Sequence, residues 1–258
     1  MIEPVRYQKK LEGKSNAHLI TFSDGNDYVV KYFQPGFEKS LPNEWVAYCL
    51  ARFLELPIPY ARIVDIPEEF SNNIKELAGL GSVKYQYASL YKPNCFDGHQ
   101  VLDVSNLTND QVQLAGIILF DYWLCNTDRT RKNILLHEVT PNIHGLSIID
   151  HAEVFGTYNW DLPDLENLPT TLLKSATHQI MTLFIEEEEN FSEQLEIIQT
   201  IPVLLMEEIV DLIPEEWAVS KEEKKAMVSA LIRRRKRVLP ELTQRFIKKI
   251  YRPLKSYD

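Results

Sequence analysis

Three stretches near the start of the chain alternate apolar and polar residues, which is the period of half-buried β-strands. They span residues 5–11, 17–22 and 27–33. Residues 23–26, Ser-Asp-Gly-Asn, are turn formers that separate the second stretch from the third. We therefore expect three consecutive antiparallel strands at this end of the chain.

A helix and two more strands are expected to follow. Residues 41–56, LPNEWVAYCLARFLEL, begin near a proline that suits a first helical turn, and they stop before Pro57. The apolar stripe that is expected to pack on the sheet consists of Trp45, Cys49, Leu50, Phe53 and Leu54. Residues 60–66 and 83–91 alternate again and predict two further strands.

The second half of the chain shows mostly helical periodicity, interrupted by one hairpin. Thr108 is the predicted N-cap of a helix whose apolar face leads up to residue 124. Apolar runs at residues 134–136 and 146–149 predict two paired strands. Further helices are predicted over residues 172–184, 191–201, 202–213, 221–238 and 242–256, with Pro202, Pro214 and Pro240 at helix starts. The fold class that follows is α+β.

Polar side chains gather around this predicted hairpin. The loop before it, in LFDYWLCNTDRTRKNILLH, carries Asp128 and, five residues later, Asn133. The second strand, in SIIDHAEVF, ends on Asp150. Because antiparallel pairing places the start of one strand beside the end of the other, Asn133 is expected near Asp150, with Asp128 at the edge of the loop. Two carboxylates and one amide would then converge on one place.

Such a set suits phosphoryl transfer, in which catalysis is mostly positioning and charge neutralisation. Mg²⁺ takes oxygen ligands and keeps several waters, so Asn133 and Asp150 together with nucleotide phosphates would suffice to hold it. Asp128 would accept the proton of an attacking hydroxyl or orient that hydroxyl. The alternative is structural, because Asp and Asn also favour turns and strand ends without any catalytic role.

Lys31 lies in the apolar strand sequence YVVKYF. A lysine is costly to bury unless its charge is paired, so an anion is expected beside it. Upstream, the turn in residues 12–18, EGKSNAH, contains Gly13, Ser15 and Asn16, which allow backbone N–H groups to form an anion-binding nest. A plain hairpin turn explains the same residues equally well.

Two motifs carry a resemblance to a known family. The run W-L-x-N-x-D-R-x-x-x-N-I-L, followed by I-I-D-H-x-x-x-F, resembles the catalytic and metal-binding segments of the HipA-like kinases, in particular their short stand-alone bacterial branch. The D-R-x-x-x-N core is more distantly similar to the phosphatidylinositol 3- and 4-kinases. The resemblance implies a two-lobed kinase fold that binds ATP between an N-terminal lobe, residues 1–95, and a helical catalytic lobe, residues 96–258.

The resemblance also implies roles for single residues. The Gly-Ser-Asn turn described above would lie at the nucleotide phosphates, and Lys31 would hold the α- and β-phosphates. Glu44, which with Asn43 matches an N-E pair of the family, would hold Lys31 in place. From the sequence alone, a glutamate in a first helical turn could instead complement the helix dipole. ATP and Mg²⁺ are therefore the expected cofactors, and the main chain of residues 89–91 is expected to face adenine.

The expected function is ATP- and magnesium-dependent transfer of the γ-phosphate to a hydroxyl acceptor. Serine or threonine of a protein is the first choice, because HipA proteins phosphorylate such residues. Two alternatives are a small-molecule or lipid kinase of the same fold and a nucleotide-binding pseudokinase that serves as a scaffold. The chain has no room for the additional N-terminal domain of the full-length HipA toxins, which leaves both an antitoxin-like partner and toxicity open.

Composition adds limits on the partners. The net charge of -9 over 258 residues argues against nucleic acid, because affinity for it requires Lys and Arg to neutralise phosphates. The five basic residues 233–237 are expected on a solvated helix face, with contact to an acidic partner as the alternative. No apolar run reaches the roughly 18 residues that a membrane helix needs, and the N-terminus has no signal-peptide core. A cytoplasmic protein that does not bind membranes is expected.

Overall fold

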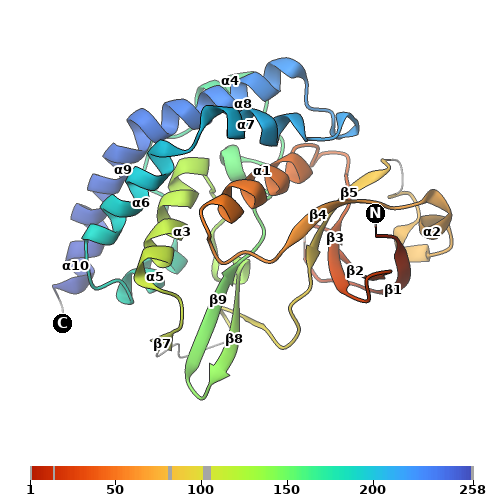
Figure 1. The fold of residues 1–258 in the computed structure, drawn as a ribbon, viewed down its shortest axis with the longest axis horizontal. Helices are drawn as coiled ribbons and strands as arrows, with labels where there is room; N and C mark the ends of the chain where they lie inside the picture. The colour runs from red at the N-terminus through yellow and green to blue at the C-terminus, as the bar shows by residue number, and fades with distance from the viewer. Residues whose placement is uncertain (1, 14, 81–82, 101–105, 257–258) are drawn as a thin grey trace.

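Five antiparallel strands form a sheet from the first third of the chain (Figure 1). The computed structural model describes residues 2–13, 15–80, 83–100 and 106–256. The strand order is β1-β2-β3-β5-β4, with bounds β1 (Pro4–Lys10), β2 (His18–Phe22), β3 (Asp27–Lys31), β4 (Ala61–Asp65) and β5 (Tyr85–Leu90). Each of the five strands predicted from alternation is confirmed. Two short helices, α2 (Glu68–Asn72) and η1 (Lys75–Leu77), connect β4 to β5.

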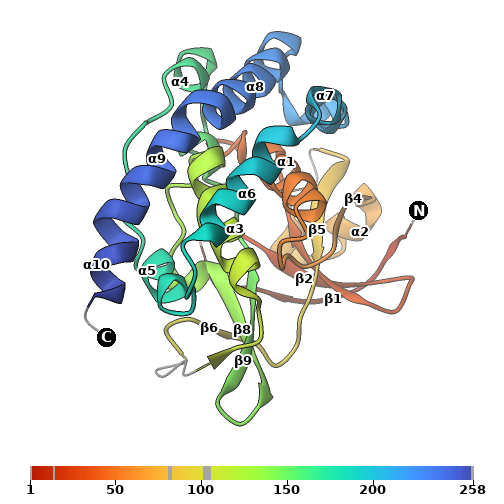
Figure 2. The same ribbon diagram turned by 60° about the vertical axis from the view of Figure 1, so that its left-hand side comes forward.

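Helix α1 (Ser40–Phe53) lies between this sheet and the helices of the second half (Figures 1 and 2). It begins two residues before Pro42, which is tolerated in a first turn because the N–H there has no helical partner. Glu44 therefore lies in the second turn, beyond the reach of the N-terminal dipole, and the dipole alternative for Glu44 is wrong. The predicted contact of Phe53 with the sheet is also wrong, because this last helical residue is 48% exposed.

A second sheet of four strands contains the predicted hairpin. Its order is β6-β8-β9-β7, with bounds β6 (Phe96–Asp97), β7 (Asn106–Leu107), β8 (Ile134–Thr140) and β9 (Ile143–Ile148). In the hairpin Ile134 pairs with Ile148, and the N–H of Ile149 donates to the carbonyl of Asn133 at 3.1 Å. The start of β8 and the end of β9 are thus adjacent, as the sequence predicted.

Helices form most of the remaining chain. They are α3 (Gln111–Leu124), η2 (Arg131–Asn133), η3 (Val154–Gly156), α4 (Leu162–Glu166), α5 (Ala176–Leu183), α6 (Glu189–Thr200), α7 (Val203–Asp211), η4 (Glu215–Trp217), α8 (Lys221–Arg233), η5 (Arg234–Val238), α9 (Leu239–Phe246), η6 (Ile247–Tyr251) and α10 (Arg252–Lys255). The N-cap of α3 is Asp110, whose side chain accepts from the Gln113 N–H at 2.6 Å. The predicted cap at Thr108 is therefore wrong by two residues, since Asp is an equally good capping residue.

The C-terminal segments from α8 to α10 follow one another without a break and form one long helix (Figure 1). Pro240 lies inside this helix, so the prediction that it starts a new one is wrong. A proline lacks the N–H that would bond four residues back, and the π-helical segment η5 directly before it provides the local widening that accommodates the ring. Pro202, in contrast, directly precedes α7 as expected.

Two hydrophobic clusters stabilise the molecule. The smaller cluster is confined to the first sheet and its covering segments, with Ile20, Tyr28 and Val30 among its members. The larger cluster joins α1 to α3 and the C-terminal helices. From Leu114 to Leu124 every residue of α3 is buried, so this helix holds the loop that follows it rigidly. No helix in the described ranges is both long enough and apolar enough to span a membrane.

Candidate active site

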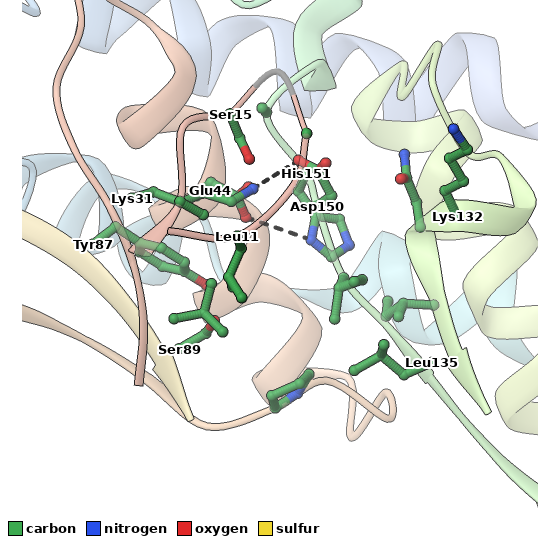
Figure 3. Close-up of a pocket in the computed structure, with 18 of the residues that line it drawn as sticks. Leu11, Ser15, Lys31, Glu44, Tyr87, Ser89, Lys132, Leu135, Asp150 and His151 are labelled. Atoms are coloured by element: carbon green, nitrogen blue, oxygen red, sulfur yellow. Dashed lines mark hydrogen bonds and ion pairs between the residues drawn. The ribbon is translucent and has the colours of Figure 1, made fainter. Parts of the chain in front are cut away.

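A cavity of about 710 Å³ separates the first sheet from the β8–β9 hairpin. Figure 3 shows side chains on both sides of the cavity, with Lys31 from the first sheet and Asp150 from the end of the hairpin pointing toward each other. The predicted site residues among its lining are Gly13, Ser15, Lys31, Glu44, Asp128, Asn133 and Asp150. Residues from the two halves of the chain therefore line the same cavity. Gly13 and Asp150, for example, are 137 positions apart in the sequence.

Lys31, at the end of β3, is the centre of an ion-pair cluster (Figure 3). Its Nζ donates to Glu44 Oε1 and, at 2.7 Å, to Asp150 Oδ1, while Lys31 as a whole is 8% exposed. Burial alone would lower the pKa of Lys31, but Asp150 and then Glu44 outweigh burial and raise it. The amine is thus held as a cation. The anion that the apolar strand required is present, and it consists of two carboxylates.

The two carboxylates differ in their surroundings. Glu44 is 2% exposed, and burial raises its pKa against the opposing effect of Lys31. The Asp150 side chain is 34% exposed toward the cavity, and although burial would raise its pKa, Lys31 lowers it. His151 Nδ1 lies 3.9 Å from Glu44 Oε2. Burial, followed by the nearby Arg129, lowers the pKa of His151 to about 3, so this imidazole is neutral at physiological pH.

Asn133 and Asp128 lie together at the start of the hairpin. Asn133 Nδ2 donates to the backbone carbonyl of Asp128 and, at 3.0 Å, to Asp128 Oδ2. This contact fixes the orientation of the amide, because the nitrogen must face Asp128 and the oxygen must face away. Asp128 is half-buried and lines the cavity. The carboxylate is therefore held in place but remains accessible.

The donor set fits a divalent cation of the magnesium type. In the part of the chain that the structure describes, neither Asn133 Oδ1 nor Asp150 Oδ2 has a hydrogen-bond partner. Both atoms are oxygens, which is the ligand type that Mg²⁺ prefers. Within the described residues no three carboxylates, imidazoles or thiols form a metal cage. A cation here would therefore need further oxygens from water or phosphate, which is how Mg²⁺ binds with nucleotides.

Asp121 is a buried carboxylate that the sequence reasoning missed. It lies in α3 with no exposed surface, and it accepts from Arg129 Nε at 2.8 Å, from Asn126 Nδ2 at 2.8 Å and from His178 Nε2 at 2.9 Å. Burial alone would raise the pKa of Asp121, but Arg129 and His178 hold it well below its usual range. The signal was available, because an aspartate in the apolar run GIILFDYWL needs a cation, by the same argument that was applied to Lys31.

Arg129 connects Asp121 to both strands of the hairpin. Its Nη1 donates to the carbonyl of Asn133 at 2.7 Å and to that of Ile149 at 2.8 Å. Its Nη2 lies 2.9 Å from His151 Nε2. One guanidinium group thus holds the backbone of Asn133 itself and contacts the two residues on either side of Asp150, Ile149 and His151. Arginine suits this task because its planar donors reach several acceptors at once.

Two of the five basic residues 233–237 are buried, so the predicted solvated face is wrong for them. Arg234 is 2% exposed and donates to the carbonyls of Tyr122 at 2.7 Å and Trp123 at 2.8 Å, at the end of α3. Arg235 is 4% exposed and donates to the carbonyl of Ile201. The last carbonyls of a helix have no helical partner, and these side chains supply the missing donors.

The turn between β1 and β2 lies partly at the cavity, and its contact with nucleotide phosphates stays a prediction. Gly13, with φ +131°, and Ser15 line the cavity, and a Cβ added at Gly13 would meet open space. Asn16 is not among the lining residues, and among the residues that the structure describes its buried Oδ1 has no hydrogen-bond partner. The turn closes as a hairpin through a bond from the Leu11 N–H to the Ala17 carbonyl at 2.8 Å. Lys14 of this turn lies outside the described residues.

The segment that is expected to face adenine lies at the cavity, and the contact with adenine stays a prediction. Residues 89–91 line the cavity, but the N–H groups of Leu90 and Tyr91 already donate to the carbonyls of Tyr60 and Asp27. These two donors are therefore used within the sheet. The sequence analysis did not identify Lys92 and Lys132, which also line the cavity. Lys92 donates to Ser147 Oγ at 2.7 Å, and Lys132 is exposed beside Asn133.

A sequence profile described as HipA-like kinase matches residues 5–250. The chain belongs to the HipA-like kinase family. Among curated proteins, no sequence matches this HipA-like kinase.

Solved structures show the fold of this HipA-like kinase. The Helicobacter pylori proinflammatory kinase CtkA has a TM-score of 0.62 at 14% identity, covering 95% of this chain and 96% of that one. The Golgi casein kinase with Mn/ADP bound has a TM-score of 0.52 at 13% identity, covering 96% and 74%. HipA of Shewanella oneidensis MR-1, solved with HipB and operator DNA, has a TM-score of 0.48 at 11% identity, covering 95% of this chain and 74% of that one. The α+β kinase-like fold is thus confirmed, whereas the lobe boundary near residue 95 stays a prediction.

Proposed function

We propose that this HipA-like kinase transfers the γ-phosphate of ATP to a hydroxyl group, with serine or threonine of a protein as the acceptor and Mg²⁺ as the metal. The observation that carries the proposal is the contact of Lys31 with both Glu44 and Asp150 inside the cavity. Asp128 and Asn133 line the same cavity. This arrangement offers a cation for phosphates, oxygens for a metal and a cavity-facing carboxylate for the acceptor.

The nucleotide would bind with its phosphates at Lys31. The amine remains charged because two carboxylates raise its pKa, and Glu44 keeps it oriented from the buried side. A phosphate would replace Asp150 as the partner of Lys31 on the open side. Mg²⁺, when bound, would neutralise phosphate charge while being held by Asn133 Oδ1 and Asp150 Oδ2. The solved casein kinase with Mn/ADP supports the use of a nucleotide and a divalent metal.

Asp128 would act on the acceptor. Its carboxylate is oriented by Asn133 Nδ2 and has access to the cavity, so it can accept the proton of an attacking hydroxyl. Arg129 holds the backbone before Asp150 through the Ile149 carbonyl, and the neutral His151 contacts Arg129. Each of these roles follows from where the side chain lies and from which atoms are already paired.

A protein acceptor is favoured by the family and by the casein kinase, whose name states a protein substrate. A small-molecule or lipid kinase is the second candidate, and the likeness of the D-R-x-x-x-N core to the phosphatidylinositol kinases stays a prediction. An antitoxin-like partner also stays a prediction.

Labelled ATP tests the proposed reaction. The chain is incubated with γ-labelled ATP and Mg²⁺, separately with a mixture of cellular proteins, a metabolite extract and lipid vesicles, and each fraction is analysed for phosphate by mass spectrometry. We expect label on serine or threonine of proteins and none with Asp128→Asn. Label found only on metabolites or lipids would show that the acceptor is a small molecule or a lipid, which is the second candidate. Nucleotide binding without transfer in every fraction would contradict the proposal and indicate a pseudokinase.

A further inference from the structure

Asn43 precedes Glu44 in α1 and is fully buried. Its Nδ2 donates to three backbone carbonyls, those of Ala152 at 2.7 Å, Val154 at 3.0 Å and Thr157 at 3.1 Å. Its Oδ1 accepts from Trp160 Nε1 at 2.8 Å. All the polar contacts of this side chain therefore reach the segment that follows Asp150. We name residues 151–157 the post-Asp150 loop.

The post-Asp150 loop needs support from outside itself. Asp150, directly before it, and Phe155, within it, both have φ +58°, a left-handed conformation that non-glycine residues adopt only when their surroundings impose it. Two backbone bonds of the loop run from the Val154 N–H to the His151 carbonyl at 3.2 Å and from the Gly156 N–H to the Cys125 carbonyl at 3.0 Å. Buried carbonyls also require donors, which Asn43 supplies to three of them. Asn43 is thus one of the groups that hold this conformation, and it is bonded to three carbonyls of the loop at once.

This contact links the two carboxylates of the ion-pair cluster. Glu44 is the next residue after Asn43 on a rigid helix, and Asp150 directly precedes the loop that Asn43 holds. Both carboxylates meet on Lys31 Nζ, although two carboxylates repel each other and one ammonium group compensates only one of them. Asp150 is also the more exposed of the two. Without a fixed loop, repulsion by Glu44 would favour movement of Asp150 into solvent.

We propose that Asn43 is a positioning residue that sets the place of Asp150 relative to Lys31 and Glu44, and thereby the Mg²⁺-dependent part of nucleotide binding. This inference rests on the proposed function, since it assigns Asp150 to the metal. Asn43 is not among the described residues that line the cavity, so it would act through the post-Asp150 loop. Residues that orient metal ligands from outside the coordination sphere typically contribute about 10- to 100-fold to metal affinity.

The test compares Asn43→Leu and the milder Asn43→Ser with Trp45→Phe. Trp45 lies on the same helix and donates from Nε1 to the Ile209 carbonyl at 3.1 Å, so Trp45→Phe loosens α1 from α7 without touching the post-Asp150 loop. The first readout is hydrogen–deuterium exchange in the protein without nucleotide or metal. We expect faster exchange at the Val154 and Gly156 amides in both Asn43 variants and unchanged exchange there in Trp45→Phe.

The second readout is the dissociation constant of ADP, measured by calorimetry with and without Mg²⁺. In the wild type and in Trp45→Phe, Mg²⁺ is expected to strengthen ADP binding. In Asn43→Leu this gain in affinity should be about 10- to 100-fold smaller. The affinity of Asn43→Leu for ADP without Mg²⁺ should equal that of the wild type. Asn43→Ser should show a smaller loss, and it decides the matter if Asn43→Leu does not fold. An unaltered Mg²⁺ effect in the Asn43 variants, or an equal loss in Trp45→Phe, would overturn the inference. Absence of any Mg²⁺ effect in the wild type would instead overturn the proposed function.

Discussion

Replacing Asp128 with asparagine is expected to slow phosphoryl transfer by about 10²- to 10⁴-fold, the usual contribution of a general base, while ADP affinity stays the same. Asparagine has the same shape but cannot take a proton at neutral pH. The amide of Asn133, which donates to Asp128 Oδ2 at 3.0 Å, can still donate to the new side-chain oxygen. The loop before β8, which contains Asp128 and Asn133, should therefore keep its structure.

Single-turnover kinetics separates this effect from binding, because it reports the chemical step directly. The matched comparison is Asp150→Asn, which should weaken binding of Mg²⁺ and nucleotide together with the rate. A variant at Asp128 that weakens ADP binding as strongly as one at Asp150 would show that Asp128 holds the nucleotide or the metal. A rate within a factor of a few of the wild type would exclude Asp128 as the base.

Replacing Asp121 with asparagine is expected to lower the free energy of unfolding by about 3–5 kcal/mol, because one partner of a buried ion pair is lost. Arg129 would remain charged in the interior, since an arginine does not lose its proton. Its bonds to the Asn133 and Ile149 carbonyls are expected to weaken as the guanidinium group moves. Phosphoryl transfer should therefore fall as well, although Asp121 lines no part of the cavity.

Urea unfolding at several pH values measures this contribution. The pKa of Asp121 in the folded protein lies below 3.8, its ordinary value. The stabilisation by its carboxylate is therefore fully present above pH 3.8 and is lost as the pH falls below that value. The difference in the free energy of unfolding between the wild type and Asp121→Asn should thus become smaller at acidic pH. Glu188→Gln is the control, because the Glu188–Arg252 pair lies on the surface, where such pairs contribute little. Equal stability of Asp121→Asn and wild type at neutral pH would refute the role of the buried pair.

Local patterns predicted much of this molecule. Alternation located the strands of the first sheet, and apolar runs located β8 and β9, because each pattern depends on neighbours within a few residues. The proximity of Asn133 to the end of β9 followed from hairpin geometry alone. Lys31 was recognised through the cost of burying a charge, and the structure places it between two carboxylates, one of them Asp150.

Contacts between distant segments could not be predicted in the same way. Arg234 lies more than 100 positions from the end of α3 that it caps, so its basic neighbours suggested a solvated face instead. The bonds from Asn43 to the post-Asp150 loop are invisible in sequence, because a buried asparagine looks like any helical asparagine. Pro240 was misplaced because the π-helical segment before it leaves no compositional sign. Tertiary packing decides each of these features.

The most direct measurement is a crystal structure with ADP and Mn²⁺, in which anomalous scattering locates the metal. Mn²⁺ accepts the same oxygen ligands as Mg²⁺. We expect the metal peak at coordination distance from Asn133 Oδ1 and Asp150 Oδ2, with the phosphates in contact with Lys31. A metal peak away from both oxygens, or a nucleotide bound outside this cavity, would contradict the assignment of the site.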